Sequence, residues 1–544
     1  MDVDIKHLPA DVEQLHRLVG ELVAEAERTL ADERRAYQEL SEKFEALRRL
    51  HFGQSSEKLT EEDIRQMLLF NEAEAGATEL SALTVRQAAS VHIAQHERTK
   101  PGRKPIADHL PREVVIHDLC DEEKRCPCCA KERPLVSEET SEEAEVIPAK
   151  VKVIRHVRRV YGPCRCEAFA DSGAAPMVRS PMPPRMIPGS IAGPGLLAYV
   201  LTAKFVDSLP FYRQETIFSR LGIEVSRATL CTWAISAAGR CGPLIELLWD
   251  RVREGPLVQM DETTMQVLRE PGRPASTKSY MWVNLGYVEE DSAFKPVVLY
   301  HYHPTRSGEV ATSVLDGYHG YLQTDGYDGY NEIGNQEGIL HVGCWAHARR
   351  KFFEASKITK KAGSAEVALA FIAELYRIEK TLRTQLADKK ISREQFLQER
   401  SAQVRPHLER FRHWLDERIE QVVPSTKLGE AIHYAHAQWP RLEHYLDGWF
   451  LTPDNNAAEN AIRPFVVGRK NWLFSDTPRG AHASAALYSL VETAKANGLE
   501  PYHYLRYLFD RLPQATQRQD HERLLPTALS PSDLLDSSTL NRPR

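Results

Sequence analysis

The segment from residue 256 to residue 345 alternates between two local patterns, and this alternation constrains the fold more than any other feature. Three apolar, strand-like runs come first, followed by a helical pattern over 309–315, a fourth strand, a second helix and a fifth strand. Turn-rich segments join the first three strands, as in a meander. The order βββαβαβ therefore predicts a mixed α/β sheet, with its strands over residues 256–268, 280–287, 296–302, 320–324 and 339–345.

Acidic residues stand at the ends of these elements. Asp261 lies in the first strand-like run, Asp325 directly follows the fourth, and Glu459 opens a later helix-like segment. Acids so placed can meet at one pole of a mixed sheet. Three carboxylates can hold two hard divalent cations and leave positions open for phosphate oxygens and water. The structural alternatives are a turn at Asp325, a solvated strand end at Asp261, and a first-turn acid favoured by the helix dipole at Glu459.

The element order matches that of ribonuclease-H-like domains, in which acids on the first and fourth strands are brought side by side. The segment that follows the last strand is almost wholly helical and has few breakers, so we interpret it as an insertion into the core. The chain is thus expected to be a multidomain α/β protein. Its predicted regions are a leucine-rich helical region at 1–70, a linker at 71–112, a zinc-binding domain at 113–170, a helix-turn-helix region at 171–250, the first part of the core at 251–346, a helical insertion at 347–450, the second part of the core at 451–512, and a tail at 513–544.

The N-terminal region carries apolar residues at spacings of three and four from about residue 10 to residue 51, which predicts one long amphipathic helix with heptad character. Glu33 interrupts the apolar seam after Leu30, so a coiled-coil dimer and packing within the chain both stay open. The linker ends in a Pro-Gly-Arg-Lys-Pro segment. Arg103 and Lys104 of that segment are candidates for an A·T-rich minor groove, the alternative being a plain basic linker.

Six of the nine cysteines lie within residues 113–170. Cys126 and Cys129 form a C-x-x-C knuckle, and Cys164 and Cys166 form a tighter C-x-C pair after a strand-like basic run. Four thiolates from two knuckles match a closed, structural Zn²⁺ site. A neighbouring cysteine could replace one of the four, and free thiols in a reducing cytosol are the alternative to a metal site.

A helix that ends at Gly222, a short turn, and a second helix N-capped by Ser226 predict a helix-turn-helix. The net charge of −6 does not by itself indicate a nucleic-acid binder, but residues 150–240 hold thirteen Lys and Arg against five Asp and Glu. A local basic face is what phosphate contact requires. The candidate DNA-binding residues along the whole chain are Arg103, Lys104, Arg155, Arg158, Arg159, Arg213, Arg227, Thr229, Arg349, Arg350, Arg463, Arg469 and Lys470, with His347 beside the two arginines that open the insertion.

These motifs closely resemble those of the transposases of the bacterial insertion sequence 66 family, a group within the acidic-triad (DDE) transposases. The matching stretches span nearly the whole chain. They include His51-Phe-Gly-Gln-Ser-Ser-Glu-Lys-Leu59, Cys126-Pro-Cys-Cys129, Met260-Asp-Glu-Thr263, Gln323-Thr-Asp-Gly-Tyr327, Cys344-Trp-Ala-His-Ala-Arg-Arg350, Asp454-Asn-Asn-Ala-Ala-Glu-Asn460 and Gly468-Arg-Lys-Asn-Trp-Leu-Phe474. The second cysteine pair departs from the family pattern, because C-x-x-C is usual there.

The resemblance implies that Asp261, Asp325 and Glu459 bind Mg²⁺ or Mn²⁺. It also implies an enzyme that hydrolyses a strand at each transposon end and then directs the freed 3′ hydroxyl at a target phosphodiester. The expected partner is double-stranded DNA, both element ends and target. Because two ends must be held together, a homodimer or larger assembly is expected, with helper proteins encoded by the same element as possible further partners.

Localisation is expected to be cytoplasmic and nucleoid-associated. The sequence holds no run of 18 apolar residues, and its N-terminus lacks the basic-then-apolar order of a signal peptide, so no membrane partner is predicted. Two other functions compete with transposition. One is a non-enzymatic DNA-binding regulator that uses the zinc knuckle and the helix-turn-helix. The other is a hydrolase, such as a glycosidase, that uses two of the carboxylates without metal.

Overall fold

The computed structural model describes residues 151–161, 177–290, 293–358 and 363–535, together with a few isolated positions before residue 129. The chain divides into two units, one within residues 89–180 and the other comprising the rest of the chain. Three predicted features lie outside the described residues. They are the leucine-rich helix apart from isolated positions between residues 11 and 40, the linker residues Arg103 and Lys104, and the zinc ligands Cys126, Cys129, Cys164 and Cys166.

A five-stranded mixed sheet forms the centre of the larger unit, which confirms the predicted mixed α/β class. Its strands are β3 (Leu257–Gln266), β4 (Lys278–Glu290), β5 (Ala293–His303), β6 (Gly320–Gln323) and β7 (Ile339–Val342). The spatial order is β5-β4-β3-β6-β7. The meander β3-β4-β5 is antiparallel, whereas β6 runs parallel to both β3 and β7. Short helices connect the parallel strands, namely α9 (Gly308–Val314), η2 (Asp328–Tyr330) and α10 (Asn331–Gly334).

One hydrophobic core joins the sheet to helices that precede it in the chain and to helices that follow it. These helices are α5 (Pro194–Phe205), α6 (Phe211–Arg220), α7 (Arg227–Arg240), α8 (Gly242–Glu254), α15 (Asn456–Trp472), α16 (Pro478–Ala496) and α17 (Pro501–Arg511). The chain then ends in short elements, η4 (Leu512–Gln514), α18 (Arg518–Glu522), η5 (Pro526–Ala528) and α19 (Pro531–Leu535).

Helix α16 covers the edge strand β5 and hydrogen-bonds to its backbone. Ser489 Oγ accepts from the N–H of Tyr300 at 2.8 Å, and Thr493 Oγ1 accepts from the N–H of Val298 at 3.0 Å. Thr493 also donates to the carbonyl of Val298 at 3.0 Å. Two small hydroxyl side chains, one helical turn apart, therefore satisfy strand groups that would otherwise face a missing neighbour.

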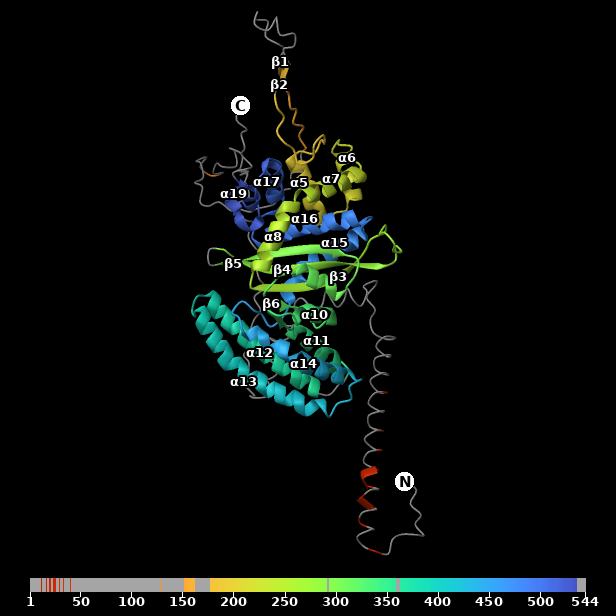
Figure 1. Ribbon diagram of the computed structural model, residues 1–544, viewed down its shortest axis with the longest axis vertical. Helices are drawn as coiled ribbons and strands as arrows, with labels where there is room; N and C mark the ends of the chain where they lie inside the picture. The colour runs from red at the N-terminus through yellow and green to blue at the C-terminus, as the bar shows by residue number, and fades with distance from the viewer. Residues whose placement is uncertain are drawn as a thin grey trace, which may run out of the picture. The chain divides into compact units, whose positions relative to one another are not determined.

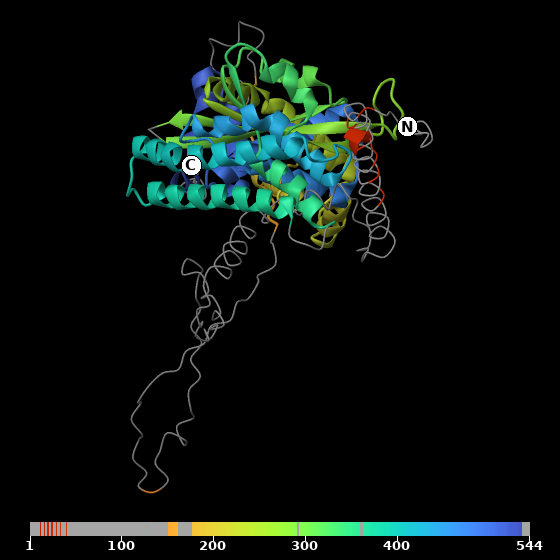
Figure 2. The ribbon, with the colours of Figure 1, turned by 90° about the horizontal axis from the view of Figure 1, so that it is seen from below.

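A second hydrophobic core belongs to the helices between β7 and α15. These are α11 (Trp345–Ser356), α12 (Ser364–Ala387), α13 (Arg393–Ile419), α14 (Lys427–Glu443) and η3 (His444–Leu446). We call them the helical subdomain. They lie on the opposite side of the strands from α15 and α16 (Figure 1), and Figure 2 shows α12 and α13 side by side when this body is seen from below.

The predicted helix-turn-helix is present as α6 and α7. Gly222, between the two helices, has a φ of +81°, a left-handed conformation that side chains other than glycine rarely adopt. Ser226 caps α7, because its side chain accepts from the N–H of Thr229 at 3.2 Å. In the smaller unit, β1 (Val160–Tyr161) pairs antiparallel with β2 (Val178–Arg179). Among the described residues, no helix is long and apolar enough to cross a membrane.

Candidate active site

Strand pairing sets Asp261 and Asp325 at matching levels of the sheet. The parallel register pairs Gln259 of β3 with Gln323 of β6, and each aspartate follows its glutamine by two residues. The two glutamines also interlock, since Gln259 Nε2 donates to Gln323 Oε1 at 2.7 Å inside the core. The side-chain hydrogen bond fixes the strand alignment that brings the two aspartates together.

Glu459 lies in the first turn of α15. The residue before this helix, Asn455, is 1% exposed, and its Nδ2 donates to the carbonyl of Met260 at 2.8 Å. This bond ties the start of α15 to β3 at the residue next to Asp261. Glu459 is itself 4% exposed. The predicted helix opening is therefore present, and its anchor to the sheet is an asparagine.

The three acids crowd one another. Burial raises the pKa of Asp261 well above its usual range, and the negative charges of Glu262, Glu459 and Asp325 raise it further. Burial also raises the pKa of Glu459 to about 8; the charge of Arg350 opposes this rise, while Asp454 and Asp325 add to it. Carboxylates that raise one another's pKa in this way are typical of functional sites.

The donor chemistry of these residues suits a divalent cation, although of the three acids only Glu459 belongs to a group of described His, Cys, Asp and Glu side chains whose ligand atoms lie within 4.8 Å of one another. Both carboxylate oxygens of Glu459 are buried and have no hydrogen-bond partner among the described residues. A buried carboxylate without a donor is costly, and a bound cation is one of the few groups that removes this cost. Oxygen donors from three acids are also the ligand type that Mg²⁺ and Mn²⁺ prefer.

Glu262, the neighbour of Asp261, has a different environment. Successive side chains of a strand point to opposite faces, so the two acids diverge. Glu262 forms an ion pair with Arg306 and accepts a hydrogen bond from the hydroxyl of Tyr330. Its carboxylate is thus satisfied within the protein, which makes Asp261 the member of the pair available to a metal.

Several predicted DNA-binding residues lie near the acids. Arg469 Nη1 donates to Thr264 Oγ1 at 3.2 Å and to Thr263 Oγ1 at 3.4 Å, so its guanidinium sits beside β3. Arg463 and Lys470 are exposed on the same helix, α15. Arg350 is close enough to Glu459 to affect its pKa, and Arg349 lies 5.8 Å from the ring of Phe353.

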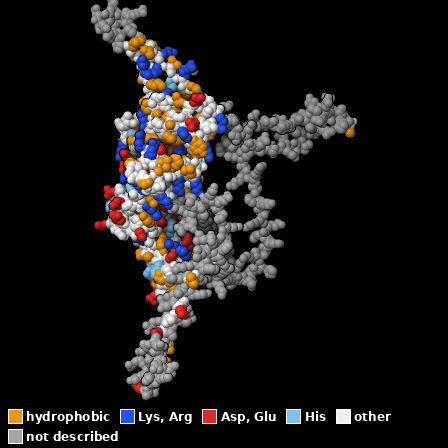
Figure 3. Space-filling view, turned by 90° about the vertical axis from the view of Figure 1, so that its right-hand side faces the viewer, with side chains coloured by type: hydrophobic (Ala, Val, Ile, Leu, Met, Phe, Trp, Pro, Cys, Tyr) orange, Lys and Arg blue, Asp and Glu red, His pale blue; other side chains and the backbone are white. Residues whose placement is uncertain are grey.

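The remaining predicted DNA-binding residues are exposed on other elements. Arg213 of α6 and Arg227 and Thr229 of α7 all face solvent. In the smaller unit, the predicted residues Arg155, Arg158 and Arg159 are also exposed. Arg158 Nε donates to the carbonyl of Ser180 at 2.8 Å. Figure 3 shows one face of the protein, on which basic side chains are interspersed with apolar and uncharged ones.

Two residues lie near Glu459 in a way that sequence reasoning did not anticipate. His347, predicted to contact DNA, has its Nδ1 3.7 Å from Glu459 Oε1. Cys344, for which no role was predicted, lies in the same group of side chains. Burial lowers the pKa of His347 to about 4. The negative charge of Asp325 opposes this fall, whereas the positive charges of Arg350 and Lys351 add to it. A cysteine and a histidine three residues apart at the start of a helix is the signal that could have identified this pair.

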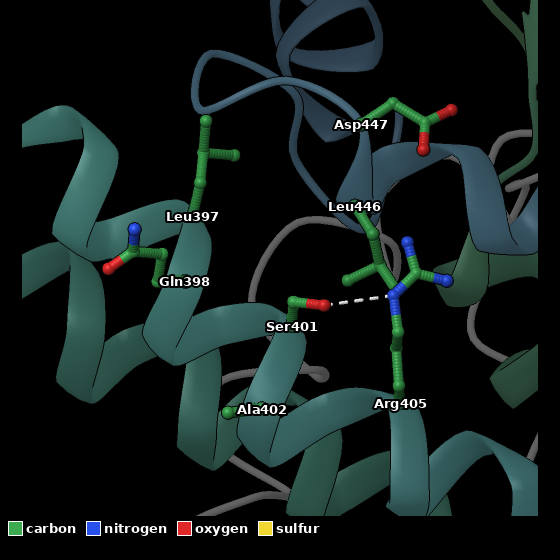
Figure 4. A pocket seen from close by; sticks show the side chains of 7 residues that line it. All are labelled: Leu397, Gln398, Ser401, Ala402, Arg405, Leu446 and Asp447. Carbon is green, nitrogen blue, oxygen red and sulfur yellow. Dashed lines mark hydrogen bonds between the residues drawn. The ribbon is translucent and has the colours of Figure 1, made fainter.

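A surface hollow of about 670 Å³ lies elsewhere, on the helical subdomain (Figure 4). Its lining consists of Leu397, Gln398, Ser401, Ala402, Arg405, Leu446 and Asp447, and Arg405 Nε donates to Ser401 Oγ at 2.9 Å. None of the predicted site residues lines this hollow. Asp261 in the middle of β3, Asp325 just after β6 and Glu459 on α15 are therefore the better candidate site.

Comparison with known proteins identifies the family. Residues 189–483 match the model of the IS66 family transposase, and residues 489–527 match the IS66 C-terminal element. Residues 123–167, which include the four predicted zinc ligands, match a zinc-finger binding domain of transposase IS66, and residues 39–115 match a model described as Transposase C of IS166 homeodomain.

Two relatives in Sinorhizobium fredii, the uncharacterized proteins y4qI and y4jD, cover nearly the full length. The first is 30% identical over 98% of this chain and 99% of its own length, and the second is 31% identical over 97% and 98%. A third uncharacterized protein, y4hP, is 29% identical over 86% of this chain. The family models and the full-length relatives agree, and the chain belongs to the IS66 family of transposases.

Proposed function

We propose that the protein is a DNA transposase that cuts a strand at each end of its element and joins the freed 3′ hydroxyl to target DNA. Asp261, Asp325 and Glu459 are its catalytic carboxylates. The observation that carries this proposal is the convergence of three acids from separate segments on one end of the sheet, where Glu459 is buried with neither oxygen hydrogen-bonded. The strand order and directions support a ribonuclease-H-like core.

The three carboxylates would hold Mg²⁺ or Mn²⁺. When bound, a pair of such ions activates the attacking oxygen and neutralises the leaving 3′ oxygen of a phosphodiester. Hydrogen bonds within the protein would hold these carboxylates in place. Asn455 holds Glu459 against β3, and the interlocked glutamines hold Asp261 level with Asp325.

Basic residues around the acids would position the DNA. Arg469 of α15 is anchored on Thr263 and Thr264, which lie on the same strand as Asp261, and would contact the phosphate near the bond to be cut. Further contacts to the DNA backbone would come from α15, through Arg463 and Lys470, and from α11, through Arg349 and Arg350. A positive charge that is fixed before the reaction stabilises the transition state without further reorganisation.

The recognition of element ends would fall to other regions. Arg213, Arg227 and Thr229 of the helix-turn-helix are exposed and suited to a DNA groove. Arg103, Lys104, Arg155, Arg158 and Arg159 would add contacts from the N-terminal half, next to structural zinc held by Cys126, Cys129, Cys164 and Cys166. Because two ends must react together, a homodimer or larger assembly in the nucleoid, with helper proteins from the same element, completes the proposal.

The decisive experiment is strand cleavage on the DNA that flanks the gene, in Mg²⁺ or Mn²⁺, with Asp261→Asn. The neutral amide keeps the shape of the side chain but loses its charge. We expect a rate loss of more than about 100-fold, greater than the loss typical of residues that only support metal ligands. Asp328→Asn is the matched control, because Asp328 is exposed and lies three residues after Asp325. Both variants should bind the DNA as the unchanged protein does.

Unchanged cleavage by Asp261→Asn would refute the assignment of the acids. If the unchanged protein binds the element ends but never nicks them in either metal, the result favours the non-enzymatic regulator. Full cleavage in EDTA would favour a metal-free hydrolase.

A further inference from the structure

A second set of metal-binding side chains adjoins the three acids. The Sγ of Cys344, an imidazole nitrogen of His347 and a carboxylate oxygen of Glu459 all lie within 4.8 Å of one another. Cys344 is the N-cap of α11 and His347 is in its first turn, so their spacing of three residues brings both to one side of the helix. Glu459 completes the set from the first turn of α15.

The polar atoms of this cluster are buried and poorly satisfied. Cys344 is 1% exposed and Glu459 is 4% exposed. His347 Nδ1 and both oxygens of Glu459 have no hydrogen-bond partner among the described residues. Two backbone contacts support the sulfur, since the N–H of Asn455 donates to Cys344 Sγ at 3.3 Å and the N–H of His347 also hydrogen-bonds to it. The three side chains thus offer ligand atoms that lie close enough together to bind one metal ion.

The chemistry of the cluster differs from that of the acids. A thiolate and an imidazole are softer donors than carboxylates, and together with one carboxylate they favour Zn²⁺ or Co²⁺ over Mg²⁺. Three protein ligands also leave a fourth position of a tetrahedral ion for water or a phosphate oxygen.

We propose that Cys344, His347 and Glu459 form a transition-metal site that binds Zn²⁺, and that its occupation inhibits Mg²⁺-dependent strand cleavage. The inhibitory part rests on the proposed function, because it requires Glu459 to be a ligand of the catalytic ions. A carboxylate drawn toward zinc on the side of α11 is less available to a cation held by Asp261 and Asp325. The site would make the enzyme sensitive to the balance between zinc and magnesium.

The first test measures metal binding without any activity. The full-length protein is saturated with Zn²⁺ or Co²⁺, desalted, and analysed for bound metal per chain, and the thiolate-to-cobalt absorption is recorded. We expect Cys344→Ser to hold about one ion fewer and to lose part of the cobalt absorption, because a thiolate ligand is removed. His347→Gln, which keeps the sulfur, should also lose the ion and should show whether an effect comes from misfolding at position 344.

The matched control is Cys231→Ser. Cys231 is an exposed free cysteine on α7, so its removal should leave metal content and spectrum unchanged. The zinc-finger region is present in every variant and contributes an equal background. Equal metal content and equal cobalt spectra in Cys344→Ser, His347→Gln and the unchanged protein would overturn the proposal.

The second test measures zinc inhibition of cleavage in excess Mg²⁺, with each variant scaled to its own rate without zinc. Cys344→Ser should need at least about tenfold more zinc for half inhibition, as expected when one ligand is lost. Equal zinc sensitivity would overturn the inhibitory role. Should Asp261→Asn cleave normally, the proposed function fails, and the metal content and cobalt spectra still decide whether the site exists.

Discussion

Two adjacent acids with the same chemistry have different surroundings. Glu262 is neutralised by Arg306 and Tyr330, whereas Asp261 faces other acids. The same contrast separates Glu459 from Asp454, whose Oδ2 accepts from the hydroxyl of Tyr376 at 2.8 Å. At the scale of the residue, hydrogen-bond partners decide which carboxylate is left for a metal ion.

Metal uptake at this site should release protons. The pKa of Glu459 is raised to about 8, so at pH 7 this carboxyl is mostly protonated in the metal-free protein. A metal ion binds the deprotonated form, and its apparent affinity should therefore rise with pH and level off above about pH 8. Calorimetry of Mn²⁺ binding in buffers of different ionisation enthalpy measures the released protons.

Glu459→Gln is the control for this measurement. The amide cannot ionise, so the protons that Glu459 contributes should disappear together with much of the affinity. Proton release that is the same in both proteins would show that another group titrates.

Among the elements, α15 carries the largest share of the proposed site. It supplies Glu459, presents Arg463, Arg469 and Lys470, and begins at Asn455, which is bonded to β3. The sequence could predict this helix, because helix formers follow a polar opening. It could not predict the asparagine anchor, since that bond depends on how the helix packs against a strand almost 200 residues earlier.

Asn455→Ala should therefore reduce activity more than stability. Losing one buried hydrogen bond costs about 1–3 kcal/mol in unfolding free energy. A misplaced Glu459 should lower the cleavage rate by a further order of magnitude at temperatures where the variant is fully folded, because small displacements of positioning groups are costly. Thermal unfolding and single-turnover cleavage separate the two effects. A loss of stability without a loss of rate in the folded protein would contradict the anchoring role.

Arg227→Ala tests the helix-turn-helix. The side chain is exposed at the start of α7, and its loss should not affect folding. If Arg227 contacts a phosphate, binding to element ends should weaken and the salt dependence of binding should fall by about one ion. Titrations by fluorescence anisotropy at several salt concentrations measure both quantities. Unchanged affinity would place DNA recognition on other residues, and Arg240→Ala, at the other end of α7, is the matched control.

Strands and helices were largely predictable, and the local environment of the acids was not. Apolar runs and turn residues are local signals, so the order of five strands and the helix-rich segment after them followed from the sequence. The match of this order to ribonuclease-H-like domains then predicted that Asp261 and Asp325 lie side by side. The approach of Cys344 and His347 to Glu459 has no local signal, because the start of α11 and the start of α15 meet only after the helical subdomain has packed.

For the whole molecule, the important feature is the presence of two hydrophobic cores joined at the sheet. The helical subdomain has its own core, which is connected to the segment before α15 by Arg400. This arginine is fully buried, pairs with Glu379, and donates to the carbonyls of Gly448 and Leu451 at 2.6 and 3.1 Å. The position of α15, and with it Glu459, therefore depends on this subdomain.

Arg400→Met should destabilise the helical subdomain by about 3 kcal/mol, because it removes one charge of a buried pair together with its hydrogen bonds to the carbonyls of Gly448 and Leu451. Arg383 still pairs with Glu379, which keeps the cost at the lower end of the usual range. Hydrogen exchange should accelerate in α12 and α13 before it does in β3–β5. Arg377→Met removes an exposed ion pair and should change stability by less than about 1 kcal/mol. Equal effects of the two variants would contradict this account.

The hydroxyl groups of Ser489 and Thr493 on β5 also affect how copies of the protein can assemble. Val298 and Tyr300 already have their backbone hydrogen bonds filled by α16, so a second chain cannot add a strand there. A continuous sheet shared between two protomers is therefore closed off at this edge. If protomers assemble to bring two DNA ends together, as proposed, they would join through surfaces other than this edge, and the sheet that carries Asp261 could stay unchanged.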